Sequence, residues 1–103
     1  MAAISRPLVL EILRQGESYG YAIVQKVREM SGGELNWAEG MLYPLLHRLE
    51  REGLIQSRWM TASGRRRKYY RIRQAGISAL SRERKLWSFA NSLMLQLQDP
   101  KHV

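Results

Sequence analysis

The order in which helix and strand signals follow one another constrains the fold of this chain more than any other feature. Three segments with apolar residues at helical spacing come first, roughly over residues 5–15, 19–30 and 39–52. Glycine follows each of them, and glycine is the residue that most often ends a helix. Pro7 lies in the first turn of the first segment, where a missing N–H costs little. Ser18 is the expected N-cap of the second.

Two strands are predicted after these helices, over residues 55–61 and 68–72, with a short extended piece earlier at residues 35–37. Ala62, Ser63 and Gly64 separate the two strands and are typical of a hairpin turn. A last helix is predicted up to about residue 98. The fold class is therefore α+β, mainly α, and the order is that of a winged helix-turn-helix followed by one C-terminal helix. We expect a DNA-binding domain at residues 1–76 and a dimerisation helix with a short tail at residues 77–103.

The third helix has two distinct faces on a helical wheel. Leucines form the inward stripe, at positions 42, 45, 46 and 49. Small, flat or hydrogen-bonding residues lie on the other side: Gly40, Tyr43, Pro44 and His47, with Arg51. Tyr43 can donate to a phosphate or touch a base edge, and His47 can donate or accept there. Gly40 and Pro44 would let DNA approach the backbone closely. The alternative is a solvated face with a partly buried Tyr43.

The second candidate site is the hairpin, where six of the nine residues from 65 to 73 are basic and none is acidic. Alternation along a strand predicts that Tyr70 faces the core, with Tyr69 on the opposite face. Four of the basic residues are expected at the hairpin tip and the start of its second strand, where they would contact phosphates: Arg65, Arg66, Arg67 and Lys68. The alternative is a charged face that contacts only solvent.

The overall charge favours a polyanionic partner. Lys and Arg number 17 against nine Asp and Glu, giving a net charge of +8. Such a domain attracts nucleic acid or an anionic membrane, but no apolar run approaches the ~20 residues that span a bilayer. Residues 1–13 do not resemble a signal peptide. The chain has no cysteine, which excludes disulfides and thiolate sites and fits a cytoplasmic protein.

The sequence offers little support for enzymatic chemistry. We find no paired carboxylates, no metal-ligand spacing and no nucleophile motif among the nine carboxylates and two histidines. No metal ion or cofactor is therefore expected, and the chain is not expected to be an enzyme.

The last helix carries a broad apolar stripe that one small domain cannot easily cover. Its members recur at heptad-like spacing, which favours a homodimer through a twofold contact: Leu80, Trp87, Ala90, Leu93, Met94 and Leu97. The alternative is that this stripe packs against the first helix of the same chain.

Three segments of the sequence resemble the PadR family of transcriptional regulators. Residues 40–55 resemble the recognition helix and its exit, residues 64–72 resemble the wing, and residues 19–23 resemble the opening of the second helix. The resemblance implies a winged-helix homodimer, usually a repressor released by a small molecule or by stress. It implies DNA contact at Tyr43, Pro44 and the wing arginines. With one helix after the wing, the chain resembles the compact subfamily.

Trp87 matches a wall position of the pore in which compact PadR-like proteins bind planar aromatic compounds. The resemblance thus implies a small, planar, hydrophobic effector at Trp87. Two departures concern DNA binding: Glu39 and Met41 stand where the family usually has Ser or Thr, and Arg73 replaces the usual N-cap Thr of the last helix.

Together these features predict a homodimeric regulator that binds specific sequences of double-stranded DNA, acts as a repressor and is released by a small aromatic effector. One alternative is a nucleic-acid binder without sequence preference, acting on RNA or on the nucleoid, because the wing arginines suit any polyanion. Another is a protein-interaction module.

Overall fold

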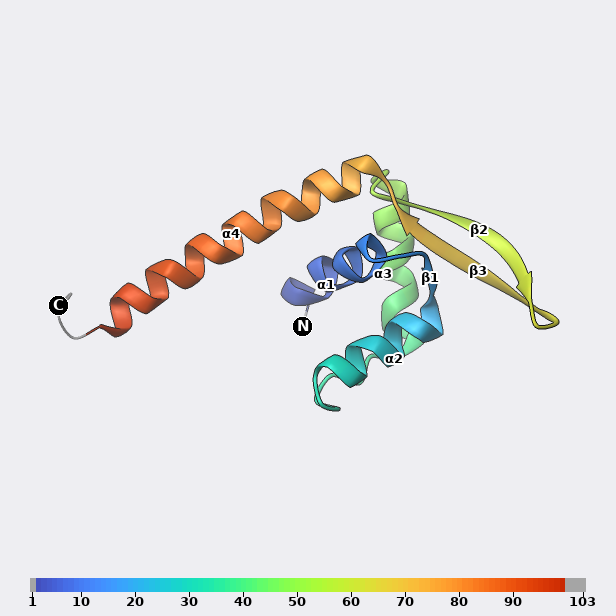
Figure 1. The fold of residues 1–103 in the computed structure, drawn as a ribbon, viewed down its shortest axis with the longest axis horizontal. Helices are drawn as coiled ribbons and strands as arrows, with labels where there is room; N and C mark the ends of the chain where they lie inside the picture. The colour runs from blue at the N-terminus through green and yellow to red at the C-terminus, as the bar shows by residue number, and fades with distance from the viewer. Residues whose placement is uncertain (1, 100–103) are drawn as a thin grey trace.

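The helices begin and end close to the positions that the sequence predicts. This computed structural model describes residues 2–99 (Figure 1). Its helices are α1 Ala2–Arg14, α2 Gly20–Met30, α3 Glu39–Arg51 and α4 Gln74–Gln98. The extended piece expected at residues 35–37 forms no strand, although Trp37 within it is buried in the core.

A three-stranded antiparallel sheet packs beside the helices, with strand order β1-β3-β2. The strands are β1 Ser18–Tyr19, β2 Ile55–Ala62 and β3 Arg65–Ile72. The prediction of Ser18 as the N-cap of α2 is wrong, because Ser18 pairs with Tyr70 in the sheet. Tyr19 occupies the N-cap position instead and makes no side-chain capping hydrogen bond. A two-residue strand is too short to leave an alternating pattern in the sequence.

The hairpin between β2 and β3 closes through Ser63 and Gly64. Both residues have positive φ angles, 52° and 75° respectively, as expected for a two-residue turn whose twist matches that of the strands. Ala62 therefore pairs directly with Arg65, and β3 starts at Arg65 rather than at residue 68. Arg65, Arg66 and Arg67 thus belong to a paired strand, and their expected position at a loop tip is corrected.

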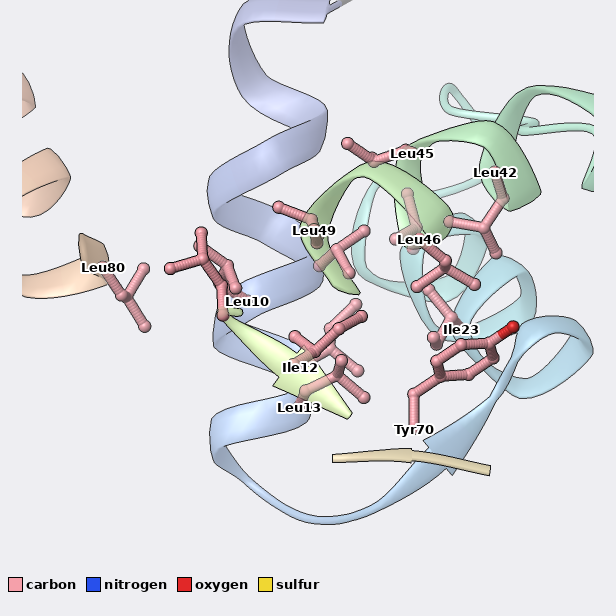
Figure 2. Close-up of a cluster of buried hydrophobic side chains, with 14 of the residues drawn as sticks. Leu10, Ile12, Leu13, Ile23, Leu42, Leu45, Leu46, Leu49, Tyr70 and Leu80 are labelled. Carbon is pink, nitrogen blue, oxygen red and sulfur yellow. The ribbon is translucent and has the colours of Figure 1, made fainter. Parts of the chain in front are cut away.

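The hydrophobic core lies where α1, α2, α3 and the base of the hairpin meet (Figure 2). The predicted leucine stripe of α3 points into it, and Leu42, Leu46 and Leu49 are completely buried. Tyr70 is the core residue of β3, as alternation predicts, and is 1% exposed. The stripe fixes the rotation of α3, because turning the helix would expose four leucines at a cost of about 1.5–3 kcal/mol each.

Leu80 also belongs to this core and is only 2% exposed. It projects from α4 toward Leu10 of α1 (Figure 2). Its assignment to a dimer interface is therefore corrected, because its own chain already covers it. For Leu80, the alternative of packing against the first helix of the same chain is therefore correct.

An ion-pair network holds α4 against the helical body. Arg6 of α1 donates two hydrogen bonds to Glu52, just after α3, at 3.0 and 3.1 Å, and one to Glu83 of α4 at 2.9 Å. The hydrogen bond from Arg6 lowers the pKa of Glu52. Glu11 of α1 adds a second link to α4 through Arg84, at 2.5 Å. These contacts link the first half of α4 to α1 and to the end of α3.

Beyond Leu80, α4 extends away from the body on the side opposite the hairpin (Figure 1), and the molecule measures 61 × 30 × 21 Å. Most apolar side chains on this part are exposed, up to 83% for Leu97. Within residues 2–99, no helix is long and apolar enough to cross a membrane.

The junction between β2 and α4 yields a test of the fold. A Cβ on Gly76 would lie 2.2 Å from the carbonyl oxygen of Leu54 and 2.6 Å from the Ile72 side chain. Gly76→Ala should therefore lower the free energy of unfolding by about 1–3 kcal/mol in a denaturant titration, through overpacking. Gly40→Ala is the matched control, because a Cβ there meets no atom within 4 Å. A Gly76→Ala variant as stable as the wild type would contradict this packing.

Candidate nucleic-acid interface

The outer face of α3 is open, as the sequence predicts. Gly40, Pro44 and His47 are all exposed, and nothing lies within 4 Å of a Cβ built on Gly40. The buried leucines on the opposite side of α3 leave these residues facing outward. A DNA duplex could therefore reach the backbone near the N-terminal half of α3.

Tyr43 lies at the edge of this face rather than fully in solvent. The residue is 37% exposed, and its hydroxyl lies against Gly20, where an added Cβ would come within 2.7 Å of it. Burial raises the pKa of the Tyr43 hydroxyl, and the negative charge of Glu39 raises it further. Tyr43 therefore presents a neutral hydroxyl at the junction of α2 and α3. Sequence reasoning noted Gly20 within a motif but missed its role as the surface on which Tyr43 rests.

The wing, formed by β2 and β3, distributes its basic residues over two faces. Alternation along β3 puts Arg66 and Lys68 on the same face as the buried Tyr70, and Arg65 and Arg67 on the opposite face. The cations that the sequence brings together thus point in two directions from one strand.

Aromatic rings accompany the wing cations. The guanidinium of Arg66 lies 4.7 Å from the centre of the Trp59 ring, and that of Arg67 lies 4.4 Å from the centre of the Tyr19 ring. The Lys68 ammonium is 5.8 Å from the Tyr70 ring. Sequence reasoning missed Tyr19 and Trp59 as parts of the site, because their strands were either not predicted or not placed in register.

A groove of about 720 Å³ separates the outer face of α3 from the wing. It brings together the candidates from both elements, with Glu39 as the one carboxylate among the lining residues. The groove is lined by Tyr19, Gly20, Tyr21, Glu39, Tyr43, His47, Trp59, Arg65, Arg66, Arg67, Lys68 and Tyr70. Gly40 and Pro44 lie outside this lining. All four basic wing candidates and two of the four α3 candidates therefore share one concave surface.

The wing cations are electrostatically available. Among the described residues 2–99, no carboxylate lies within 4 Å of the charged groups of Arg65, Arg66, Arg67 or Lys68. Arg58 on the neighbouring strand differs, because Glu17 accepts two hydrogen bonds from it, each at 2.9 Å. Four unpaired positive charges on one hairpin create a local attraction for phosphate groups. In the same part of the chain, no three His, Asp or Glu side chains lie close enough together to hold a metal ion.

A known protein family matches the part of the chain that forms this groove. The sequence profile of the transcriptional regulator PadR-like family matches residues 9–82, which include α2, α3 and the whole wing. The chain belongs to the PadR-like family. Members of this family are transcriptional regulators and not enzymes.

This PadR-like chain is also similar to individual proteins, both in sequence and in structure. The transcriptional regulator Rv3488 of Mycobacterium tuberculosis is 36% identical over 77 residues, which cover 75% of this chain and 69% of the relative. A PadR family transcription regulator from Clostridium difficile R20291 superimposes with a TM-score of 0.82 at 34% identity, covering 91% of this chain and 97% of that one.

The structure of Bacillus subtilis PadR in complex with operator DNA is also similar. It superimposes with a TM-score of 0.68 at 28% identity, over 76% of this chain and 45% of that one. The winged helix-turn-helix predicted from the order of helices and strands is confirmed by these comparisons.

Tyr70, on the floor of the groove, gives a prediction about pH. Burial raises its pKa to about 12, and Glu50 and Tyr43 act in the same direction. A raised tyrosine pKa contributes stability below the unfolded value near 10, and this contribution is lost as the pH rises toward 12. Tyr70→Phe should remain folded, because the hydroxyl has no hydrogen-bond partner among the described residues.

An alkaline titration followed by tyrosinate absorbance checks this prediction. Tyr70→Phe should lack the last-titrating group of the wild type. If the Tyr70 hydroxyl, identified as the group that the variant lacks, titrates in the ordinary range of an exposed tyrosine, Tyr70 is not buried in solution and the prediction is wrong.

Proposed function

We propose that this PadR-like chain is a sequence-specific regulator of transcription that binds double-stranded DNA as a homodimer and represses its target. The observation that carries the proposal is the groove, whose lining combines the four unpaired wing cations with Tyr43 and His47 of α3. A phosphate backbone bordering the major groove fits this arrangement, with α3 reaching base edges and the wing contacting phosphates. The operator complex of the Bacillus subtilis relative supports a duplex DNA partner.

Each candidate residue has a role in this proposal. Tyr43 and His47 contact base edges or phosphates from α3, and Gly40 and Pro44 allow the duplex to approach. The wing residues bind phosphates: Arg65, Arg66, Arg67 and Lys68. Glu39, at the N-terminus of α3, repels phosphate and limits how the duplex can lie at that end.

Homodimerisation through α4 is part of the proposal. The exposed apolar side chains beyond Leu80 support it, because such a stripe marks an interaction surface. The proposed interface retains Trp87, Ala90, Leu93, Met94 and Leu97. The division into a DNA-binding unit at residues 1–76 and a dimerisation unit at residues 77–103 is also proposed, and its boundary falls within the first turns of α4.

We propose further that a small, planar, hydrophobic effector binds at Trp87. An apolar groove of about 420 Å³ between α1 and α4 supports this, because Trp87 lines it together with Pro7, Leu8 and Leu80. Since the same α4 also contacts Arg6 through Glu83, a ligand there could alter the position of α4. The proposed partner, duplex DNA of the cell, implies a cytoplasmic location.

A binder of nucleic acid without sequence preference is the second candidate. The wing favours it, because its cations would bind any phosphate backbone. The structured outer face of α3 distinguishes the two, since only a sequence-specific protein needs base contacts from that helix.

Removing the wing charges tests the proposed contact with phosphates. The double variant Arg66→Ala/Arg67→Ala should weaken binding to every duplex and lower the slope of log affinity against log salt by about 2 per protomer, or about 4 for the proposed dimer. Fluorescence anisotropy over a salt series measures both effects. Arg82→Ala/Lys85→Ala is the matched control, because it removes the same charge from exposed positions on α4 that do not line the groove. Equal slopes for the two variants would rule out phosphate contact by the wing.

Polar substitution on α4 tests the proposed dimer. Leu93→Gln/Met94→Gln should produce monomers in sedimentation velocity, because amides replace apolar surface within the stripe. Leu95→Gln should leave the dimer intact, since the helical repeat puts Leu95 outside the stripe. Leu95 is a suitable control because it is as exposed as Met94. A dimer that survives the double variant would move the interface elsewhere.

A further inference from the structure

Two aromatic residues of the sheet, one on the wing and one on β1, have no role in the function proposed so far. Trp59, on β2, is 57% exposed although tryptophan is normally largely buried. Tyr19, on β1, lies half-buried at the opposite edge of the sheet. Both line the groove that faces α3.

Trp59 lies where it can hold Arg66. It is directly opposite Lys68 in the β2–β3 ladder, so Arg66, two positions along β3, is its diagonal neighbour on the same face. The Arg66 guanidinium lies 4.7 Å from the centre of the indole ring. This distance is well within the range of an attractive cation–π contact.

Tyr19 has the equivalent relation to Arg67 on the other face of β3. It is directly opposite Tyr69, and the two rings meet edge to face with centroids 5.1 Å apart. Arg67 is again the diagonal neighbour, with its guanidinium 4.4 Å from the Tyr19 ring centre. Each edge strand thus supplies one ring to one of two adjacent arginines on the central strand.

A ring holds an arginine differently from a carboxylate. Glu17 occupies N–H donors of Arg58 and offsets its charge. A ring lying against the guanidinium fixes its position but leaves its charge and its in-plane N–H donors free for a phosphate. Fixing a long side chain before binding also reduces the conformational entropy lost when the complex forms.

We propose that Trp59 and Tyr19 are positioning residues that hold Arg66 and Arg67 in orientations ready to bind DNA phosphates. This inference rests on the proposed function, because it assigns the two rings to the same interface. It makes the wing a preorganised phosphate clamp rather than a flexible cationic arm.

The first test compares Trp59→Leu, which removes the ring, with Trp59→Phe, which keeps an aromatic face. Trp59→Leu should weaken duplex binding about two- to fivefold, the range of one exposed cation–π contact. Trp59→Phe should keep most of the wild-type affinity for duplex DNA. Tyr19→Leu and Tyr19→Phe form the equivalent pair for Arg67. Thermal unfolding identifies any variant whose fold has changed.

A double-mutant cycle then separates positioning from other roles. If Trp59 acts through Arg66, Trp59→Leu should have no further effect on affinity in an Arg66→Ala background. Additive losses would mean that Trp59 acts independently of Arg66, and would overturn the inference. The same cycle applies to Tyr19 and Arg67.

The cycle also distinguishes failure of the inference from failure of the proposed function. If Arg66→Ala weakens binding but Trp59→Leu does not, the rings are not positioning residues and wing contact with DNA stands. If Arg66→Ala leaves affinity and salt slope unchanged, the assigned phosphate contact fails, and the positioning role fails with it.

Discussion

The burial of one leucine stripe on α3 is the constraint on which the rest of the structure depends. Leu42, Leu46 and Leu49 are completely buried against the other helices and the base of the wing. This packing leaves a single rotation for α3, in which Gly40, Tyr43 and His47 face outward. Tyr70 joins the same core from β3, so the wing and α3 are fixed relative to each other. The groove between them follows from that core.

The distribution of charge separates scaffold from candidate site. Arg6 pairs with Glu52 just after α3 and with Glu83 of α4, so it joins α1 to both. Arg14 pairs with Glu11 within α1, and Arg58 of β2 pairs with Glu17 in the segment before β1. The four wing cations have no such partners within the described residues, and three of them, Arg66, Arg67 and Lys68, lie near aromatic rings. The net positive charge is thus concentrated on the wing, whose four cations leave β3 on two faces and line the groove beside α3. Arg6 also connects the end of α3 with α4, the helix proposed to dimerise.

Sequence reasoning predicted most of this fold because its main elements carry long, regular patterns. The leucine spacing and the Ala62-Ser63-Gly64 turn located α3 and the hairpin. Elements that depend on pairing across the chain were missed: β1 has two residues, and its Ser18 was taken for an N-cap. The arginines were assigned to a tip because charge alone does not show where strand pairing starts. Leu80 could not be told from its stripe neighbours, because helical periodicity does not show which turn of α4 leaves the core.

Sequence specificity is the central claim, and it depends on base contacts from α3 rather than on wing charge. Fluorescence anisotropy of the purified protein with duplex DNA from upstream of its own gene tests it most directly, with random duplex and RNA of equal length as competitors across a salt series. A sequence-specific regulator should bind the upstream duplex tightly and in a salt-dependent way, and this binding should survive excess random competitor. Equal affinity for all three polymers would contradict it and would identify a general polyanion binder instead.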